Sequence, residues 1–287
     1  MSAASSSPPT RRTLGGTLLC LTAGAIAVGF LLPILWMVLS AFKSQEEIFR
    51  YGAPLSWRTF VPVAPTLENF REVFTTAPFA RYMLNSTIVA TSVTLLGLLV
   101  NALAAYAFAR LEFPFRRILF LVVLSTLMIP FEMIVVPLYL MVRTLGWINT
   151  YQGIIVPLLA NPFSIFLLHQ FFLGLPTTFE DAAKMDGASW RTIFFRIVLP
   201  LSKPALITVG LITFLRAWSA FLWPLIVINS QEKMVIEMGI APFSSEFAIY
   251  WGRIFAASTL ASFPLIVIFV CLQRYYIEGV VKSGIKG

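Results

Sequence analysis

The chain has few of the residues that most enzymes use for catalysis or metal binding. It contains two cysteines and one histidine in 287 residues, and charged residues make up only 12% of it. Cys20 and Cys271 both lie within apolar stretches, so they give no disulfide framework and no metal-ligand spacing, and His169 stands alone. We therefore expect no metal site and no cofactor held by this chain.

Several catalytic motifs are also missing. No Gly-Lys-Ser or Gly-Lys-Thr occurs, so the chain lacks the loop with which ATPases cradle phosphates. Neither Gly-x-Ser-x-Gly nor His-Glu-x-x-His is present, so an intramembrane hydrolase has no support. If ATP drives this protein, another chain binds the ATP and its magnesium ion.

Apolar residues are abundant instead. They make up 58% of the chain, and the mean hydropathy is +0.84, whereas a soluble domain carries about 25% charged residues. The net charge of +8 could suggest nucleic acid, but no basic cluster with interleaved aromatics occurs. The composition indicates a polytopic membrane protein that binds no nucleic acid.

Six apolar stretches are long enough to cross a bilayer, which takes about 20 residues each. They cover residues 15–40, 83–109, 118–141, 152–173, 205–229 and 256–276. The first could be a cleaved signal peptide, since Arg11 and Arg12 precede it and Ala25-Ile-Ala27 is a small-residue site. The apolar run continues to Leu39, which favours an uncleaved span. The predicted fold is an all-α membrane protein with six transmembrane helices.

Basic residues predict the orientation. Twelve lie on the side that holds both termini and the segment 174–204, against eight on the other side, five of which fall in the long loop 41–82. Short loops carry the orientation signal, so both termini and the segment 174–204 should be cytoplasmic.

These segments give the predicted organisation. Residues 1–13 are rich in Ser, Pro and Thr and should form a disordered cytoplasmic tail. Residues 14–276 should form the transmembrane domain, and residues 277–287 a cytoplasmic C-terminal tail.

The polar segment between the fourth and fifth spans is the most informative part of the chain. Thr177 and Glu180 have capping-box spacing, so a helix should begin near Thr178 and end at Gly187, where glycine can take the left-handed conformation. Ser189 should cap a second helix. That helix should present an apolar face made of Trp190, Ile193, Phe194, Ile197 and Val198.

This segment resembles the Glu-Ala-Ala (EAA) loop of ABC-importer permeases. The matching positions are Asp181, Ala182, Ala183, Asp186 and Gly187, preceded by Glu180, with Asp181 where the family usually has Glu. In that family the loop is the coupling helix that docks into the ATPase subunit. The alternative is an ordinary amphipathic helix on the membrane surface, which needs no Asp-Gly break.

Most of the chain is similar to one group of these permeases, the MalG-like subunits of maltose-type carbohydrate importers. The resemblance rests on Asn85-Ser86, Ala104 to Arg110, Ile129-Pro130, Val136 to Tyr139, Gly146-Trp147, Trp218 to Leu222 and Lys286-Gly287. One departure is Ser219, where the group usually has Asn.

The resemblance implies a type I importer permease fold (MetI-like) in a bacterial inner membrane. It also implies five kinds of partner: a second permease, two ATPase subunits or one ATPase homodimer, an extracytoplasmic solute-binding protein, the lipid bilayer, and a carbohydrate substrate. The C-terminal tail becomes a candidate ATPase contact.

Four residues within the spans are candidates for the substrate path, because polar groups are costly in a bilayer. Glu132 and Arg216 should lie roughly 21 Å and 17 Å into their spans at 1.5 Å per residue. We expect them to pair with each other, as a structural link or beside the path, or to flank the path separately. Asn161, with Pro162, interrupts the fourth span and so marks a lining. Trp218 could stack on a sugar ring, although packing against helices is the commoner role.

Two other functions stay open from the sequence. The chain could be a permease for glycerol 3-phosphate, a glycerophosphodiester or another polyol within the same importer group. It could also be a secondary transporter with Glu132 as a proton or ion site, in which case uptake would collapse with an uncoupler while ATP remained.

Overall fold

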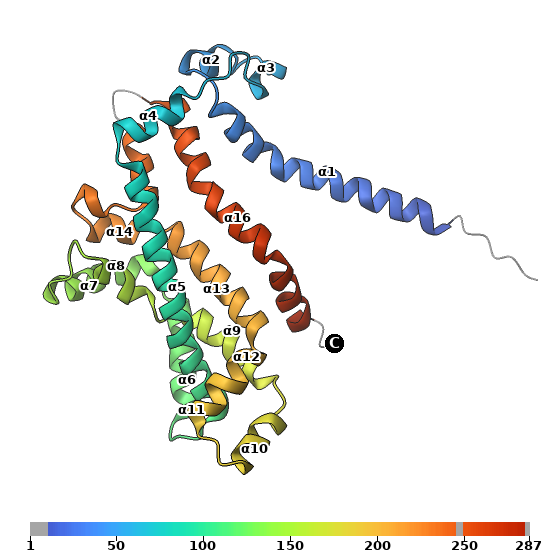
Figure 1. Cartoon of the computed structure of the whole chain (residues 1–287), viewed down its shortest axis with the longest axis vertical. Helices are drawn as coiled ribbons and strands as arrows, with labels where there is room; N and C mark the ends of the chain where they lie inside the picture. Colours follow the sequence, from blue (N-terminus) through green and yellow to red (C-terminus); the bar gives the residue numbers. More distant parts are fainter. Residues whose placement is uncertain (1–10, 245–248, 285–287) are drawn as a thin grey trace, which may run out of the picture. The chain divides into compact units, whose positions relative to one another are not determined.

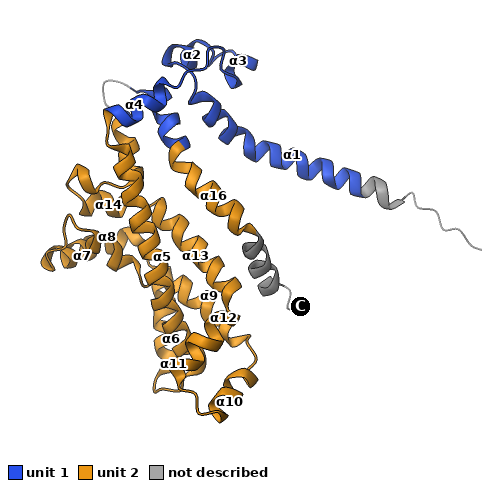
Figure 2. Ribbon diagram, in the orientation of Figure 1, with its two compact units in different colours: residues 1–75, 243–259 blue, residues 76–242, 260–287 orange. Residues whose placement is uncertain are grey.

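The computed structural model describes the backbone of residues 11–244 and 249–284, and side chains over 16–244 and 249–273. Within these residues the structure is helical, apart from one isolated β-bridge between Ser244 and Ile249 (Figure 1). The chain divides into two compact units, residues 1–75 with 243–259 and residues 76–242 with 260–287 (Figure 2).

The first unit contains one long apolar helix and three short ones. They are α1 (Arg11–Ser40), α2 (Gln45–Arg50), α3 (Trp57–Phe60) and most of α4 (Glu68–Thr76). Ser44 caps α2 by accepting a hydrogen bond from the Glu47 amide, as an N-cap serine does. The buried Glu47 carboxylate accepts from the Val63 amide at 2.6 Å and ties the loop 61–64 to α2.

Three helices form the centre of the second unit. They are α5 (Phe79–Arg110), α9 (Pro162–Leu173) and α13 (Lys203–Trp218), and each packs against the other two. Helices associate in a bilayer through close packing of small residues, because lipid is as apolar as the side chains. Gly97 fits this rule, since a β-carbon there would lie 3.2 Å from the Leu159 carbonyl oxygen.

Shorter elements surround this centre. In chain order they are α6 (Arg116–Ser125), η1 (Thr126–Met128), α7 (Phe131–Thr144), α8 (Tyr151–Ile155), η2 (Val156–Leu158), α10 (Thr178–Met185), α11 (Trp190–Ile193), η3 (Phe194–Val198), α12 (Leu199–Leu201), α14 (Leu222–Val227), η4 (Gln231–Lys233), α15 (Ile236–Ile240) and η5 (Ala241–Phe243). The last element is the long helix α16 (Trp251–Gly284), which begins in the first unit.

Six spans result if each bent helix pair counts as one. The continuous spans are Gly16–Ser40, Phe79–Arg110 and Trp251–Gln273. The bent pairs are Arg116–Met128 with Phe131–Thr144 (106°), Tyr151–Leu158 with Pro162–Leu173 (43°), and Trp190–Leu201 with Lys203–Trp218 (80°). By length and composition, the described residues therefore agree with six predicted spans in number, but the fifth pair covers 190–218, whereas the predicted stretch is 205–229.

The predicted fifth span, 205–229, is wrong as a single helix. Helix α13 ends at Trp218 and α14 begins only at Leu222, with Ser219 between them as the C-cap. The sequence stays apolar on both sides of Arg216 and Ser219, and hydropathy does not register a backbone break. The third stretch is also broken, at Ile129 and Pro130, where proline cannot donate a helical hydrogen bond.

The predicted tails extend beyond the described residues. The disordered tail 1–13 falls mostly on residues 1–10, which lie outside them, while α1 already begins at Arg11. Of the C-terminal tail 277–287, the backbone belongs to α16 as far as Gly284, and residues 285–287 lie outside the described part.

Candidate functional site: a coupling loop and a membrane cavity

The polar loop between α9 and α13 folds into two short helices around a glycine. Helix α10 spans Thr178–Met185, and Gly187 follows with φ +79°, the left-handed conformation expected of it. The Ser189 hydroxyl then accepts from the Thr192 amide and caps α11. Both helix starts and the glycine turn confirm the sequence prediction.

The predicted capping box is wrong. Thr177 makes no side-chain cap bond, and Glu180 turns inward, where it is 3% exposed. Its carboxylate lies 2.9 Å from Arg110 Nε and accepts a hydrogen bond from the Tyr106 hydroxyl at 3.4 Å. A buried cation is a stronger partner for a carboxylate than a local amide, so this distant ion pair outcompetes the cap.

Arg110 joins α10 to two spans. It is the last residue of α5, and its Nη2 donates to the carbonyl oxygens of Phe172 and Leu175, each at 2.6 Å, while Nε faces Glu180. These carbonyls belong to the C-terminal end of α9 and the residues after it. One guanidinium thus connects the ends of α5 and α9 with the first turn of α10.

The opposite face of α10 is exposed. Met185, at the last turn, is 89% exposed, and Asp181, Ala182, Asp186 and Gly187 are exposed as well. Asp181 pairs with Lys184 at 3.3 Å on the surface, an interaction worth at most about 1 kcal/mol. Of the matching residues, Asp181, Ala182, Asp186 and Gly187 therefore lie where another protein can reach them, whereas Ala183 is half-buried against the core and Glu180 is buried.

Helix α11 and the turn that follows it pack the loop against the protein core. Ile193, Phe194 and Val198 are buried in a core with Tyr106 and Phe172, whereas Arg191 and Arg196 are exposed. The predicted apolar face is thus confirmed at these three positions, Ile197 is partly buried, and Trp190 remains 45% exposed. Residues Phe194–Val198 form a π-helical turn rather than plain α-helix.

Asparagine side chains hold the break in the fourth span. The buried Asn101 of α5 donates to the Gly97 and Leu159 carbonyl oxygens at 2.6 and 2.8 Å, and its Oδ1 accepts from the Asn161 amide at 2.8 Å. Asn161 in turn caps α9 by accepting from the Ser164 amide. Backbone groups freed by such a break need partners inside a bilayer, and Asn101, which the sequence analysis missed, supplies them.

A cavity of about 270 Å³ opens beside this break. It lies between α5, the start of α7, the end of η2, the start of α9, the end of α13 and α14. The lining residues are Val93, Phe131, Leu158, Asn161, Phe163, Ser164, Ile212, Thr213, Arg216, Ala217, Ala220, Phe221, Leu222 and Trp223. Two predicted path residues, Asn161 and Arg216, therefore meet at one cavity.

The other two predicted path residues do not line it. Glu132 is exposed in the first turn of α7 and forms no ion pair with Arg216 within the described residues. Trp218 is 2% exposed: its ring stacks on Phe214, and its Nε1 donates to the Ala261 carbonyl at 3.1 Å. The geometry gives Trp218 a packing role. Glu132 and Arg216 do not pair within the described residues, so the alternative in which they flank the path separately stays a prediction.

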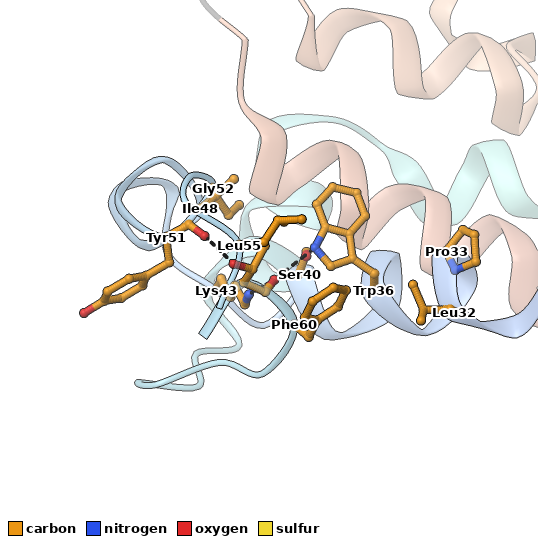
Figure 3. Close-up of a pocket in the computed structure, with 11 residues that line it drawn as sticks. Leu32, Pro33, Trp36, Ser40, Lys43, Ile48, Tyr51, Gly52, Leu55 and Phe60 are labelled. Carbon is orange, nitrogen blue, oxygen red and sulfur yellow. Dashed lines mark hydrogen bonds between the residues drawn. The ribbon is translucent and has the colours of Figure 1, made fainter. Parts of the chain in front are cut away.

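A second cavity, of about 340 Å³, lies within the first unit (Figure 3). Its lining is mostly apolar, and its one ammonium group, Lys43, donates to the carbonyl oxygens of Arg58 and Thr59 at 3.0 and 2.7 Å. Burial lowers the pKa of Lys43, partly offset by the nearby Glu47. Because Trp36 also donates to Thr59, these polar groups serve to fix the loop.

Together, the spans, the exposed loop helix and the membrane cavity define a helical transport subunit rather than an enzyme. Residues 93–282 match the family model described as binding-protein-dependent transport system inner membrane component. The chain belongs to this family.

Relatives of known function share most of the chain. It is 34% identical over 270 residues to the arabinooligosaccharides transport system permease protein AraQ of Halalkalibacterium halodurans, covering 93% of this chain and 96% of that protein. It is 34% identical over 275 residues to the trehalose/maltose transport system permease protein MalG of Thermococcus litoralis, and the match covers 94% of this chain and 96% of that protein. It is 32% identical over 271 residues to the sn-glycerol-3-phosphate transport system permease protein UgpE of Pectobacterium atrosepticum, and the match covers 92% of this chain and 94% of that protein.

A solved structure shares the fold. It is the crystal structure of a bacterial ABC transporter involved in the import of the acidic polysaccharide alginate. One chain of that structure matches this chain with a TM-score of 0.80 at 21% identity, and the match covers 95% of this chain and 100% of that chain. The predicted importer-permease fold is confirmed. As a family member, the protein is a multi-pass inner-membrane subunit that works with a partner permease, an ATPase and a solute-binding protein.

Proposed function

We propose that this chain is a transmembrane subunit of an ATP-driven carbohydrate importer, and that α10 docks on the ATPase in the cytoplasm. The observation that carries the proposal is the division of α10 into two faces. Glu180 is buried against Arg110, while Asp181, Ala182, Asp186 and Gly187 are exposed. One face can bind a partner while the other passes its movement to the spans.

The mechanism is alternating access. When the ATPase subunits close on ATP, they displace α10, and the Glu180–Arg110 contact carries that displacement to the ends of α5 and α9. Both helices border the membrane cavity, α5 at Val93 and α9 at Asn161, and Asn101 of α5 bonds directly to the Asn161 amide. A movement of the loop is thereby linked to the shape of the cavity, which we assign as part of the solute path.

The partners and orientation complete the proposal. The assembly contains a second permease, two ATPase subunits or one homodimer, and an extracytoplasmic solute-binding protein, with both termini of this chain in the cytoplasm. Carbohydrate import is supported by the relatives that transport arabinooligosaccharides and trehalose or maltose. The secondary-transporter alternative has no support from the cavity, because Glu132 does not line it.

Gly187 provides the test. Its backbone is left-handed, and a β-carbon there would meet nothing within 4 Å in this chain, so within the chain a substitution acts through backbone conformation. Gly187→Val, whose branched side chain resists this conformation, should release the ATPase from the purified complex or abolish solute-dependent ATP hydrolysis. Gly187→Asn is the matched control, because asparagine tolerates the left-handed region, and it should behave like the wild type.

The readout is mass spectrometry of proteins that co-purify with the tagged chain from its own membrane in mild detergent. We expect an ATPase, a second permease and a solute-binding protein with the wild type and with Gly187→Asn. Recovery of the wild-type chain without an ATPase, or solute uptake by Gly187→Val at the wild-type rate, would contradict the assignment of α10.

A further inference from the structure

The membrane cavity contains an uncompensated positive charge. Of its fourteen lining residues, Arg216 is the only ionisable one. Its guanidinium forms no ion pair with any described residue, and no hydrogen bond from it to a described residue is present. Arg216 is itself exposed in this chain, so its counter-charge comes from solvent or from a partner outside the described chain.

The position of Arg216 makes this charge costly. It lies in the last turn of α13, 13 residues after Lys203, or roughly 20 Å along the helix axis at 1.5 Å per residue. Ionisable residues within a span face a cavity or a partner and mark solute pathways. Since Arg216 lines the cavity, an anion that enters the cavity would be its natural partner.

The groups around Arg216 fit a sugar that carries the anion. The Asn161 carboxamide uses its oxygen to cap α9, which leaves its NH₂ free to donate into the cavity. The rings of Phe163 and Phe221 are 38% and 43% exposed at the rim and can lie against the apolar face of a sugar. A guanidinium matches the planar oxygens of a carboxylate, phosphate or sulfonate.

We propose that this cavity selects a negatively charged carbohydrate and that Arg216 binds its anionic group during passage. The inference rests on the proposed importer function and adds the substrate class. The cavity volume of about 270 Å³ is just below the lower limit of roughly 300 Å³ for ordinary ligand sites. A volume of this size is expected if a second permease supplies the other half of the path.

The experiment uses the whole complex in proteoliposomes with its own solute-binding protein. Initial uptake rates are measured for three acidic probes, digalacturonate, glycerol 3-phosphate and sulfoquinovosyl glycerol, and two neutral ones, maltose and arabinotriose. We expect uptake of at least one acidic probe and of neither neutral probe. The acidic probe that is transported shows whether the anion is a carboxylate, a phosphate or a sulfonate.

Variants then assign the selection to Arg216. Arg216→Gln should lower the uptake rate of the acidic probe roughly 10- to 100-fold, the range expected when a charged hydrogen bond is lost. Arg216→Lys should keep most of the rate because it keeps the charge. Arg143→Gln, which removes an exposed arginine at the end of α7, is the control and should match the wild type.

Three results would overturn the inference. Uptake of a neutral probe, or failure to take up any acidic probe, would refute the proposed acidic substrate class. In that case ATP hydrolysis stimulated by the binding protein would still show that the importer is intact. Unchanged acidic uptake by Arg216→Gln would remove the role of Arg216. Loss of the second permease from the purified Arg216→Gln complex would show that its partner is a protein carboxylate. Absence of stimulated ATP hydrolysis with every probe would instead refute the importer function itself.

Discussion

Glu180 and Asp181 are neighbours in the sequence with opposite surroundings. Glu180 is almost fully buried beside Arg110, whereas the Asp181 side chain is 61% exposed beside Lys184. The same carboxylate chemistry therefore serves two purposes. Glu180 positions the helix from within, and Asp181 is available to a partner.

This difference predicts two distinct mutant phenotypes. Glu180→Ala leaves the Arg110 guanidinium buried without its counter-charge, which costs about 3 kcal/mol or more, so the apparent melting temperature of the purified complex should fall by roughly 6 °C or more. Asp181→Ala should change stability by less than about 0.5 kcal/mol but should reduce solute-dependent ATP hydrolysis. Equal melting temperatures for the two variants would contradict the buried role of Glu180.

At this scale the sequence predicts the position of Glu180 at the start of α10 correctly, but not its partner. The spacing of Thr177 and Glu180 satisfied a local rule, and nothing local reveals that Arg110, 70 positions earlier, lies against the same carboxylate. Arg110 was noticed only as the end of a family motif. Arg110 is buried where three segments meet, and this position depends on the tertiary fold, which short-range sequence patterns do not contain.

At the level of elements, proline and asparagine decide where the spans bend. Asn161 and Pro162 break the fourth span at the predicted place, and Asn101 completes the break from α5. The fifth span breaks at Ser219 instead of continuing to residue 229. A Pro or Asn-Pro pair can be read from the sequence because it removes a backbone donor, whereas the stop after Trp218 has no such signal.

Asn101 offers a prediction for this element. Asn101→Ala would leave the partly buried Leu159 carbonyl and Asn161 amide without partners, at up to about 1 to 3 kcal/mol each, so the variant should melt earlier and lose solute uptake. Thr94→Val is the matched control on the same helix, because the Thr94 hydroxyl bonds only to the Ala90 carbonyl one turn before it. If both variants keep wild-type stability, Asn101 does not hold the break.

At the scale of the whole molecule, the composition and the six apolar stretches were enough to predict a membrane transport subunit, and family membership confirms it. The missing phosphate-binding loop indicated that the ATP site lies on another chain. The cavity could not be predicted from the sequence, because its walls come from six elements between residues 93 and 223. Arg216 and Asn161 were singled out as isolated polar groups, and only the fold brings them together.

The central claim is that the exposed face of α10 contacts the ATPase. Met185, the most exposed large apolar side chain of that helix at 89%, is the position to test. Met185→Cys is made in a chain whose two natural cysteines, Cys20 and Cys271, are replaced by serine. The complex is then labelled with maleimide-benzophenone, whose maleimide bonds to the new thiol and whose benzophenone, on illumination, inserts into a C–H bond of any protein beside it; Leu55→Cys, 78% exposed in the first unit, is the control. We expect a cross-link between Met185→Cys and the ATPase, weakened or strengthened by ATP, and none from Leu55→Cys. An intact, ATP-hydrolysing complex in which Met185→Cys forms no link to the ATPase would contradict the account.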